Sequence, residues 1–123
     1  MAVQTETDVS EQISAPATPK VAVVYTTPET VLDDIARAMR LADYTQTLSL
    51  DAATLLKINI SWQHYYPACS TTPWQLEGVI KTLKADGFGE LIPTHNGTVV
   101  VDPHEGAINN KHTVVENKYG LQS

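Results

Sequence analysis

Polar and apolar side chains alternate near the end of a strand-like segment, residues 54–61. Lys57, Asn59 and Ser61 fall on one face of it, because successive side chains of a strand point to opposite sides. Open α/β sheets bind ligands at the carboxyl ends of their strands. Since a lysine ammonium attracts phosphate or carboxylate, this face predicts a site for a small anionic molecule. The alternative is a strand with one solvated face and no ligand.

A helix start follows this segment after a short loop. Ser70-Thr71-Thr72-Pro73 combines capping residues with a proline at the first helical position. The N-terminus of a helix offers backbone N–H groups and a favourable dipole to an anion. We therefore expect Thr71 and Thr72 to help orient the ligand. The same Thr-Thr-Pro triplet occurs at 26–28, so helix capping alone is the alternative.

A second group of candidate residues follows the strand-like residues 90–94. His95 and Asn96 begin a turn at the end of this run, and His95 would lie near Lys57 if the two strands are neighbours. His95, Asp102 and His104 are suitable ligand types for zinc, iron or manganese, which gives a metal-dependent enzyme as one hypothesis. Their spacing matches no established metal motif, and solvated loop residues are the competing interpretation.

Aromatic residues flank the loop before the second helix start. Tyr65, Tyr66 and Trp74 could form a wall over a ligand, or they could pack under the loop and over the sheet edge. Cys69 lies beside the helix start, but a cysteine without an assigned histidine partner is weak support for a nucleophile. No glycine-rich loop follows the first strand-like segment, which argues against a dinucleotide or P-loop site.

Composition restricts the class of protein. The chain has 123 residues, 42% of them hydrophobic, a net charge of −6 and one cysteine. Its eight basic residues form no cluster, so we expect no nucleic-acid partner. No apolar run approaches the ~18 residues of a membrane helix, and no signal-peptide pattern begins the chain. A single cysteine leaves no internal disulfide and no iron–sulfur cluster within the chain, and a reducing, cytoplasmic location is expected.

Strand–helix units repeat along the chain. Residues 1–19 are polar and acidic, which is typical of a disordered tail, and residues 20–123 form the expected domain. Residues 20–25 are apolar on both faces, which favours a central parallel strand, and a helix should run from the first Thr-Thr-Pro to Ala42. A second helix carries an apolar stripe and ends near Gly87. The stripe comprises Leu76, Val79, Ile80 and Leu83.

The C-terminal third contains a strand at 90–94 and a less regular remainder. Residues 98–101 could pair in a hairpin, form a separate strand or be extended loop. A last helix over 109–119 would turn Val114, Val115 and Tyr119 inward, with Gly120 as its cap. Together the units predict an open, mostly parallel, Rossmann-like sheet of three or four strands with flanking helices. Such a sheet is half of a doubly wound domain, so we expect a longer protein or a partner chain at its open edge.

The order of these motifs resembles the domain-of-unknown-function 362 (DUF362) family. There a strand ending in Lys-Pro-Asn leads to a threonine-rich helix start, as residues 54–60 lead to 70–73, and a polar turn follows, as at 95–97. Ile58 replaces the usual proline. The resemblance covers residues 20–120 and is best at 54–97. It implies a prokaryotic α/β protein longer than this chain; many members carry a ferredoxin-like domain, and no common reaction is established for them.

These observations lead to one main hypothesis and two alternatives. We expect a small-molecule or anion-binding α/β domain of an enzyme-like protein, in which Lys57 contacts the anion, Asn59 and Thr71 orient it, and His95 binds metal or moves protons. The first alternative is a protein interaction module without chemistry. The second is a metal-dependent enzyme that uses His95, Asp102 and His104.

Overall fold

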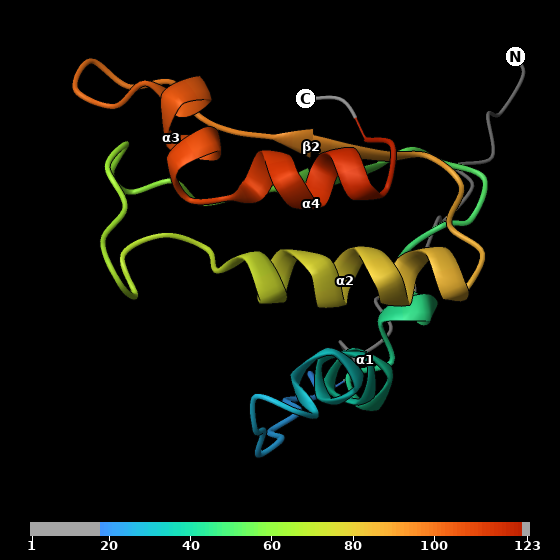
Figure 1. Ribbon diagram of the computed structural model, residues 1–123. Helices are drawn as coiled ribbons and strands as arrows, with labels where there is room; N and C mark the ends of the chain where they lie inside the picture. The colour runs from blue at the N-terminus through green and yellow to red at the C-terminus, as the bar shows by residue number, and fades with distance from the viewer. Residues whose placement is uncertain (1–17, 122–123) are drawn as a thin grey trace, which may run out of the picture.

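A two-stranded parallel sheet lies above helix α2 (Figure 1). The computed structural model describes residues 18–121, so residues 1–17 of the expected tail lie outside the described part. Strand β1 (Thr54–Lys57) pairs with β2 (Leu91–Thr94), and Thr54 is opposite Leu91. The ladder continues with a 2.9 Å hydrogen bond from the Ile58 N–H to the Thr94 carbonyl. The structure therefore confirms a mixed α/β class and a parallel strand–helix–strand unit.

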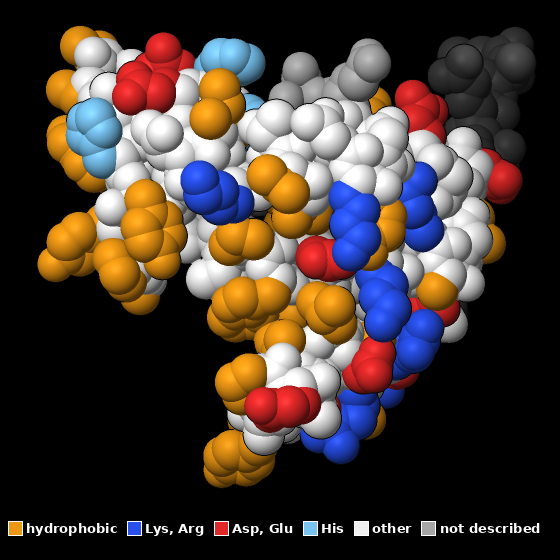
Figure 2. All heavy atoms as spheres, in the orientation of Figure 1, with side chains coloured by type: hydrophobic (Ala, Val, Ile, Leu, Met, Phe, Trp, Pro, Cys, Tyr) orange, Lys and Arg blue, Asp and Glu red, His pale blue; other side chains and the backbone are white. Residues whose placement is uncertain are grey.

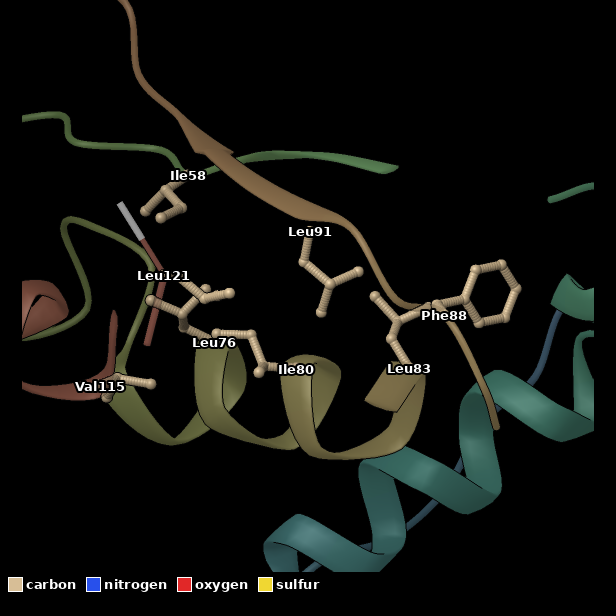
Figure 3. Packing of buried hydrophobic residues seen from close by; sticks show 8 residues of the cluster. All are labelled: Ile58, Leu76, Ile80, Leu83, Phe88, Leu91, Val115 and Leu121. Carbon is tan, nitrogen blue, oxygen red and sulfur yellow. The ribbon is translucent and has the colours of Figure 1, made fainter. Parts of the chain in front are cut away.

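Helix α2 (Pro73–Ala85) packs its apolar stripe against the sheet. Leu76, Ile80 and Leu83 point from the helix toward Ile58 and Leu91 (Figure 3). Burial of each such side chain contributes about 1.5–3 kcal/mol, which makes this contact the main source of stability for the fold. The buried cluster comprises Ile58, Leu76, Ile80, Leu83, Phe88, Leu91, Val115 and Leu121.

Both ends of α2 match the sequence prediction. Thr72 and Gln75 form a capping box at the start of the helix, and Pro73 occupies its first position. Gly87 follows the end with a φ of +94°, the left-handed conformation that glycine adopts most easily. Val79 of the predicted stripe is partly buried.

The predicted first strand does not form. Within residues 18–121 the sheet contains β1 and β2 only. Segment 20–25 makes no backbone–backbone hydrogen bond with the described residues. Val21, Val23 and Tyr25 are 86%, 77% and 92% exposed. The physical reason is the position of the following helix, which packs on α2 and holds segment 20–25 away from β1 (Figure 1).

Helix α1 (Val31–Leu41) begins after a turn at 28–30, later than the Thr-Thr-Pro triplet predicted. None of its residues is fully buried, because α2 covers only part of its apolar face. A salt bridge fixes its end: Arg40 Nη2 lies 2.7 Å from Asp86 Oδ1. The short 3₁₀ helix η1 (Tyr44–Gln46) adds a 2.5 Å hydrogen bond from the Tyr44 hydroxyl to Asp86.

Two short helices replace the single helix predicted near the C-terminus. Helix α3 (Pro103–Asn109) and helix α4 (His112–Lys118) are separated at Lys111, whose φ is +67°. Residues 98–101 form neither a strand nor a hairpin. Val115 is buried as predicted, whereas Val114 is 64% exposed, because the break at Lys111 changes the face that α4 turns inward. Gly120 has a φ of +66° and follows the end of α4, as predicted.

Candidate ligand-binding site

Hydrogen bonds join the end of β1 to the start of α2. The Thr71 N–H donates to the Asn59 carbonyl (2.9 Å), and the Asn59 N–H donates to Thr71 Oγ1 (3.1 Å). Asn59 Nδ2 donates to Ser61 Oγ (2.8 Å), and the Ser61 N–H donates to Ser70 Oγ (3.2 Å). The structure therefore brings the predicted residues Asn59, Ser61 and Thr71 together. It uses much of their hydrogen-bonding capacity to fix the loop itself.

The first turn of α2 offers fewer free donors than the sequence predicts. The Thr72 N–H donates to Gln75 Oε1 (3.0 Å), and the Gln75 N–H donates to Thr72 Oγ1 (3.3 Å). With the Thr71 N–H bonded to Asn59, three N–H groups at this helix start have partners inside the protein. Thr72 is a helix cap, as the alternative interpretation held.

Lys57 lines a hollow that neither Asn59 nor Ser61 lines. β1 ends at Lys57 rather than at residue 61, yet burial continues to alternate beyond it: Lys57, Asn59 and Ser61 are exposed, whereas Ile58 is buried. Lys57 lines a shallow hollow of about 320 Å³ together with Thr71 and Gln75. Its ammonium forms no ion pair with residues 18–121.

A larger cavity of about 720 Å³ is also lined by Thr71. The aromatic residues Tyr65, Tyr66 and Trp74 line it, and Lys111 supplies its cation. The surface is indented beside loop 62–70, and hydrophobic side chains border the indentation (Figure 2). Lys111 also makes no ion pair within the described part of the chain. The cavity thus combines aromatic surface with one uncompensated positive charge.

Two strained residues lie at this cavity. Ala68 and Lys111, both lining residues, have φ angles of +59° and +67°. Left-handed backbone costs a residue with a Cβ about 1–2 kcal/mol. Such strain concentrates at functional sites, where the surrounding structure holds it in place.

Contacts with α3 hold the outer wall of the cavity. Asn109 Nδ2 donates to the Gln63 carbonyl (2.9 Å), and Asn110 Nδ2 donates to the Trp62 carbonyl (3.2 Å). Gly106 allows α3 to approach closely, because a Cβ there would lie 2.5 Å from Ile60 Cγ2. These contacts join loop 62–66 and α3 into one wall. Sequence reasoning missed Asn109 and Asn110; their signal is two adjacent residues of low helix propensity at the start of the predicted helix.

His95 lies beside α4, not at the hollow of Lys57. Burial lowers its pKa below 6.5; the charge on Glu116 opposes this shift and the charge on His112 adds to it. His112 Nε2 lies 2.6 Å from the Thr71 carbonyl oxygen. Asn96 is exposed and lines neither hollow.

The predicted metal ligands are not brought together. Asp102 Oδ1 accepts hydrogen bonds from the N–H groups of His104 (2.8 Å) and Glu105 (3.1 Å), so this carboxylate caps α3. His104 is exposed. Among residues 18–121, no group of three or more His, Cys, Asp and Glu side chains is placed to hold a metal ion.

Comparison with family models, curated proteins and solved structures finds no match for this chain. The resemblance to the DUF362 family therefore stays a prediction. None of the helices between residues 18 and 121 has the length and apolar character needed to cross a membrane.

Proposed function

We propose that this chain is a small-molecule-binding α/β domain whose ligand carries an anionic group and an apolar ring. The cavity of about 720 Å³ carries this proposal, because ligand sites in proteins span about 300–1,000 Å³ and are mostly apolar with a few polar groups. The hollow at Lys57 is smaller and shallower, at about 320 Å³.

Each part of the cavity has a role in this proposal. The Lys111 ammonium contacts the anionic group as a point charge. Tyr65, Tyr66 and Trp74 pack against the ring, since aromatic pairs contribute about 0.5–1.5 kcal/mol beyond their buried area. Thr71 Oγ1 accepts from the Asn59 N–H, and its hydroxyl hydrogen can still be donated to the ligand.

Three small probes separate these contributions. Benzenesulfonate carries a ring and a charge, sulfate only the charge, and benzyl alcohol only the ring. We expect benzenesulfonate to bind at least about tenfold more tightly than either of the others in an NMR titration, equivalent to about 1.4 kcal/mol. The largest shift changes should fall at Tyr66, Trp74 and Lys111. Equal affinity for benzenesulfonate and sulfate, or shifts confined to residues around Lys57, would contradict the proposal.

A second candidate function, an interaction module, is favoured by segment 20–25. Among residues 18–121 its backbone makes no backbone–backbone hydrogen bond and β1 pairs with β2 alone, and three apolar side chains of the segment are exposed. Extended segments of this kind accept a strand from a partner. A sheet of three or four strands, Rossmann-like and of the DUF362 type, would form if a strand were added at the edge of β1. Sedimentation tests whether the chain assembles through this segment. A chain that is monomeric at all concentrations, and whose sedimentation is the same in Val23→Lys, would argue against the interaction module.

A further inference from the structure

Strand β1 has one edge without a neighbouring strand. The N–H groups of Thr54 and Ile58 each donate to a carbonyl on the side of β2, at 2.9 Å. Backbone groups of successive residues point alternately to the two edges of a strand, so those of Leu55 and Lys57 point to the opposite edge. No strand among residues 18–121 pairs there. Such an edge is a template for the addition of another strand.

An apolar hollow of about 320 Å³ lies beside β1, and side chains of β1 and α2 line it. A third strand next to β1 would direct alternate side chains toward α2, and this hollow is where they would lie. The main chain and the side chains of an added strand therefore both find a place here. The apolar lining residues are Leu55, Leu56, Ile58, Leu76 and Val79.

Segment 20–25 has the properties of the strand that this edge lacks. Exposure alternates along it, as in an extended strand. Ala22 and Val24 are partly buried and line a hollow together with residues of α1. The other face, formed by Val21, Val23 and Tyr25, is exposed. One face of the segment thus lies on its own α1, and the second apolar face lacks a cover among the described residues.

The segment does not reach β1 of its own chain. Ile35 of α1 packs closely on Gly78 of α2, and segment 20–25 runs beside α1, away from β1 (Figure 1). The same segment of a second copy is free of this constraint. Because each chain carries both the segment and the edge, two copies can pair reciprocally and form a closed, two-fold symmetric dimer.

Charges indicate the direction of pairing. Lys57 lies at the carboxyl end of β1, and Glu29 lies shortly after the carboxyl end of segment 20–25. Both are exposed, and neither forms an ion pair with the residues that the structure describes. Parallel pairing brings the two opposite charges to the same end of the sheet. Antiparallel pairing would instead bring Lys20 next to Lys57, and like charges repel.

We propose that two copies of this chain bind each other by strand addition: segment 20–25 of each copy pairs in parallel with the free edge of β1 of the other. Val21, Val23 and Tyr25 fill the hollow between β1 and α2, while Ala22 and Val24 stay on their own α1. The added strand is then covered on both faces, as its apolar composition requires. This proposal rests on the second candidate function, the interaction module, and names its partner; it does not depend on the ligand cavity.

Sedimentation of matched lysine variants tests the pairing. The parent should show a monomer–dimer equilibrium. Val23→Lys should raise the dissociation constant of the dimer by about tenfold or more, because it places a charge in an apolar hollow. Val99→Lys makes the same change at an exposed valine outside the segment and should leave the dissociation constant unchanged. Circular dichroism checks that both variants fold. Equal effects of the two substitutions, or a parent that is monomeric at all concentrations, would overturn the proposal.

Exchange of the two charges tests the parallel direction. Glu29→Lys and Lys57→Glu should each weaken the dimer by about threefold, the effect expected for an exposed ion pair. The double variant should restore the affinity of the parent, since it again places opposite charges at the same end of the sheet. A double variant that is weaker than either single variant would contradict parallel pairing.

A peptide separates failure of this pairing from failure of the interaction module. The probe is a synthetic peptide with the sequence of residues 19–27, and its control carries Val23→Lys. We expect excess peptide to dissociate the dimer and to shift the amide signals of Leu55 and Lys57 in NMR spectra, and the control peptide to do neither. If the chain is monomeric but the peptide produces these shifts, pairing between copies is wrong and the edge of β1 remains a docking site. If the chain is monomeric and the peptide does not bind, the interaction module fails as well.

Discussion

Gly78 of α2 lies close to Ile35 of α1, and replacing this glycine with alanine tests how the two helices pack. A Cβ at this position would lie 2.6 Å from Ile35 Cδ1, 3.0 Å from its Cβ and 3.1 Å from its Cγ2. A side-chain rotation can move Cδ1 but cannot move Cβ. The added methyl group must therefore displace α1 from α2.

Two effects of opposite sign compete in Gly78→Ala. Helix propensity favours alanine over glycine by about 1 kcal/mol in a helix interior, whereas overpacking of a tight contact costs about 1–3 kcal/mol. Because three atoms of Ile35 crowd the new methyl group, we expect overpacking to dominate and the free energy of unfolding to fall by about 1 kcal/mol. For a domain of this size the midpoint of thermal unfolding should fall by roughly 4–8 °C.

Urea and thermal unfolding followed by circular dichroism measure this change. Gly89→Ala is the matched control, because no atom lies within 4 Å of a Cβ there; its stability should be unchanged or higher by about 0.4–1 kcal/mol. The effects of Ile35→Ala and Gly78→Ala on the free energy of unfolding should not be additive in the double variant, because both substitutions change the same contact. A Gly78→Ala variant more stable than the parent would refute this packing of α1 on α2.

Three further predictions concern the ends of α2. The hydrogen bond from Arg40 is the main cause that lowers the pKa of Asp86 below 3.8. The stability that the ionised Asp86 contributes is present above pH 3.8 and is lost as the pH falls through the lowered pKa. Asp86→Asn should therefore make the free energy of unfolding in urea less dependent on pH in the acid range. Burial is the largest cause that raises the pKa of Tyr44 to about 12, so stability should fall as pH rises from about 10 to about 12. This alkaline loss should be smaller in Tyr44→Phe, and the parent should show it as delayed tyrosinate absorbance. Thr72→Ala should lower the stability by about 1 kcal/mol in thermal unfolding, whereas Thr27→Ala, in the same triplet but outside a helix cap, should cost less.

Local sequence signals predicted the central unit of the fold. Thr72 and Pro73 defined the start of α2, Gly87 defined its end, and the period of its apolar residues defined the buried face. These signals succeed because capping, proline geometry and helical periodicity depend on residues near one another in the chain. The parallel pairing of β1 and β2 followed from the same unit.

Strands that need a distant partner were not predictable in the same way. Residues 20–25 and 98–101 have strand-like composition, yet neither belongs to the described sheet. Whether a strand-like segment pairs depends on the packing of other elements, here on α1 packing against α2. The break at Lys111 was missed because a left-handed lysine has no strong sequence signal.

The candidate site was predictable in part for the same reasons. The convergence of Asn59 and Thr71 followed from their places after a strand and before a helix. The larger cavity did not, because it depends on the backbone of Ala68 and Lys111 and on contacts between α3 and loop 62–66. Burial of His112 and Glu116 was also unforeseen, since both are polar residues that usually lie at the surface.

One comparison tests the central proposal most directly: the affinity of benzenesulfonate for Lys111→Ala against that for Lys57→Ala. Both substitutions remove one lysine charge, and neither lysine forms an ion pair with residues 18–121. We expect Lys111→Ala to raise the dissociation constant by about tenfold or more, because a hydrogen bond to a charged group contributes about 1.5–3 kcal/mol, and Lys57→Ala to leave it unchanged. The reverse result would place the anion at the hollow of Lys57 and contradict a site at the larger cavity.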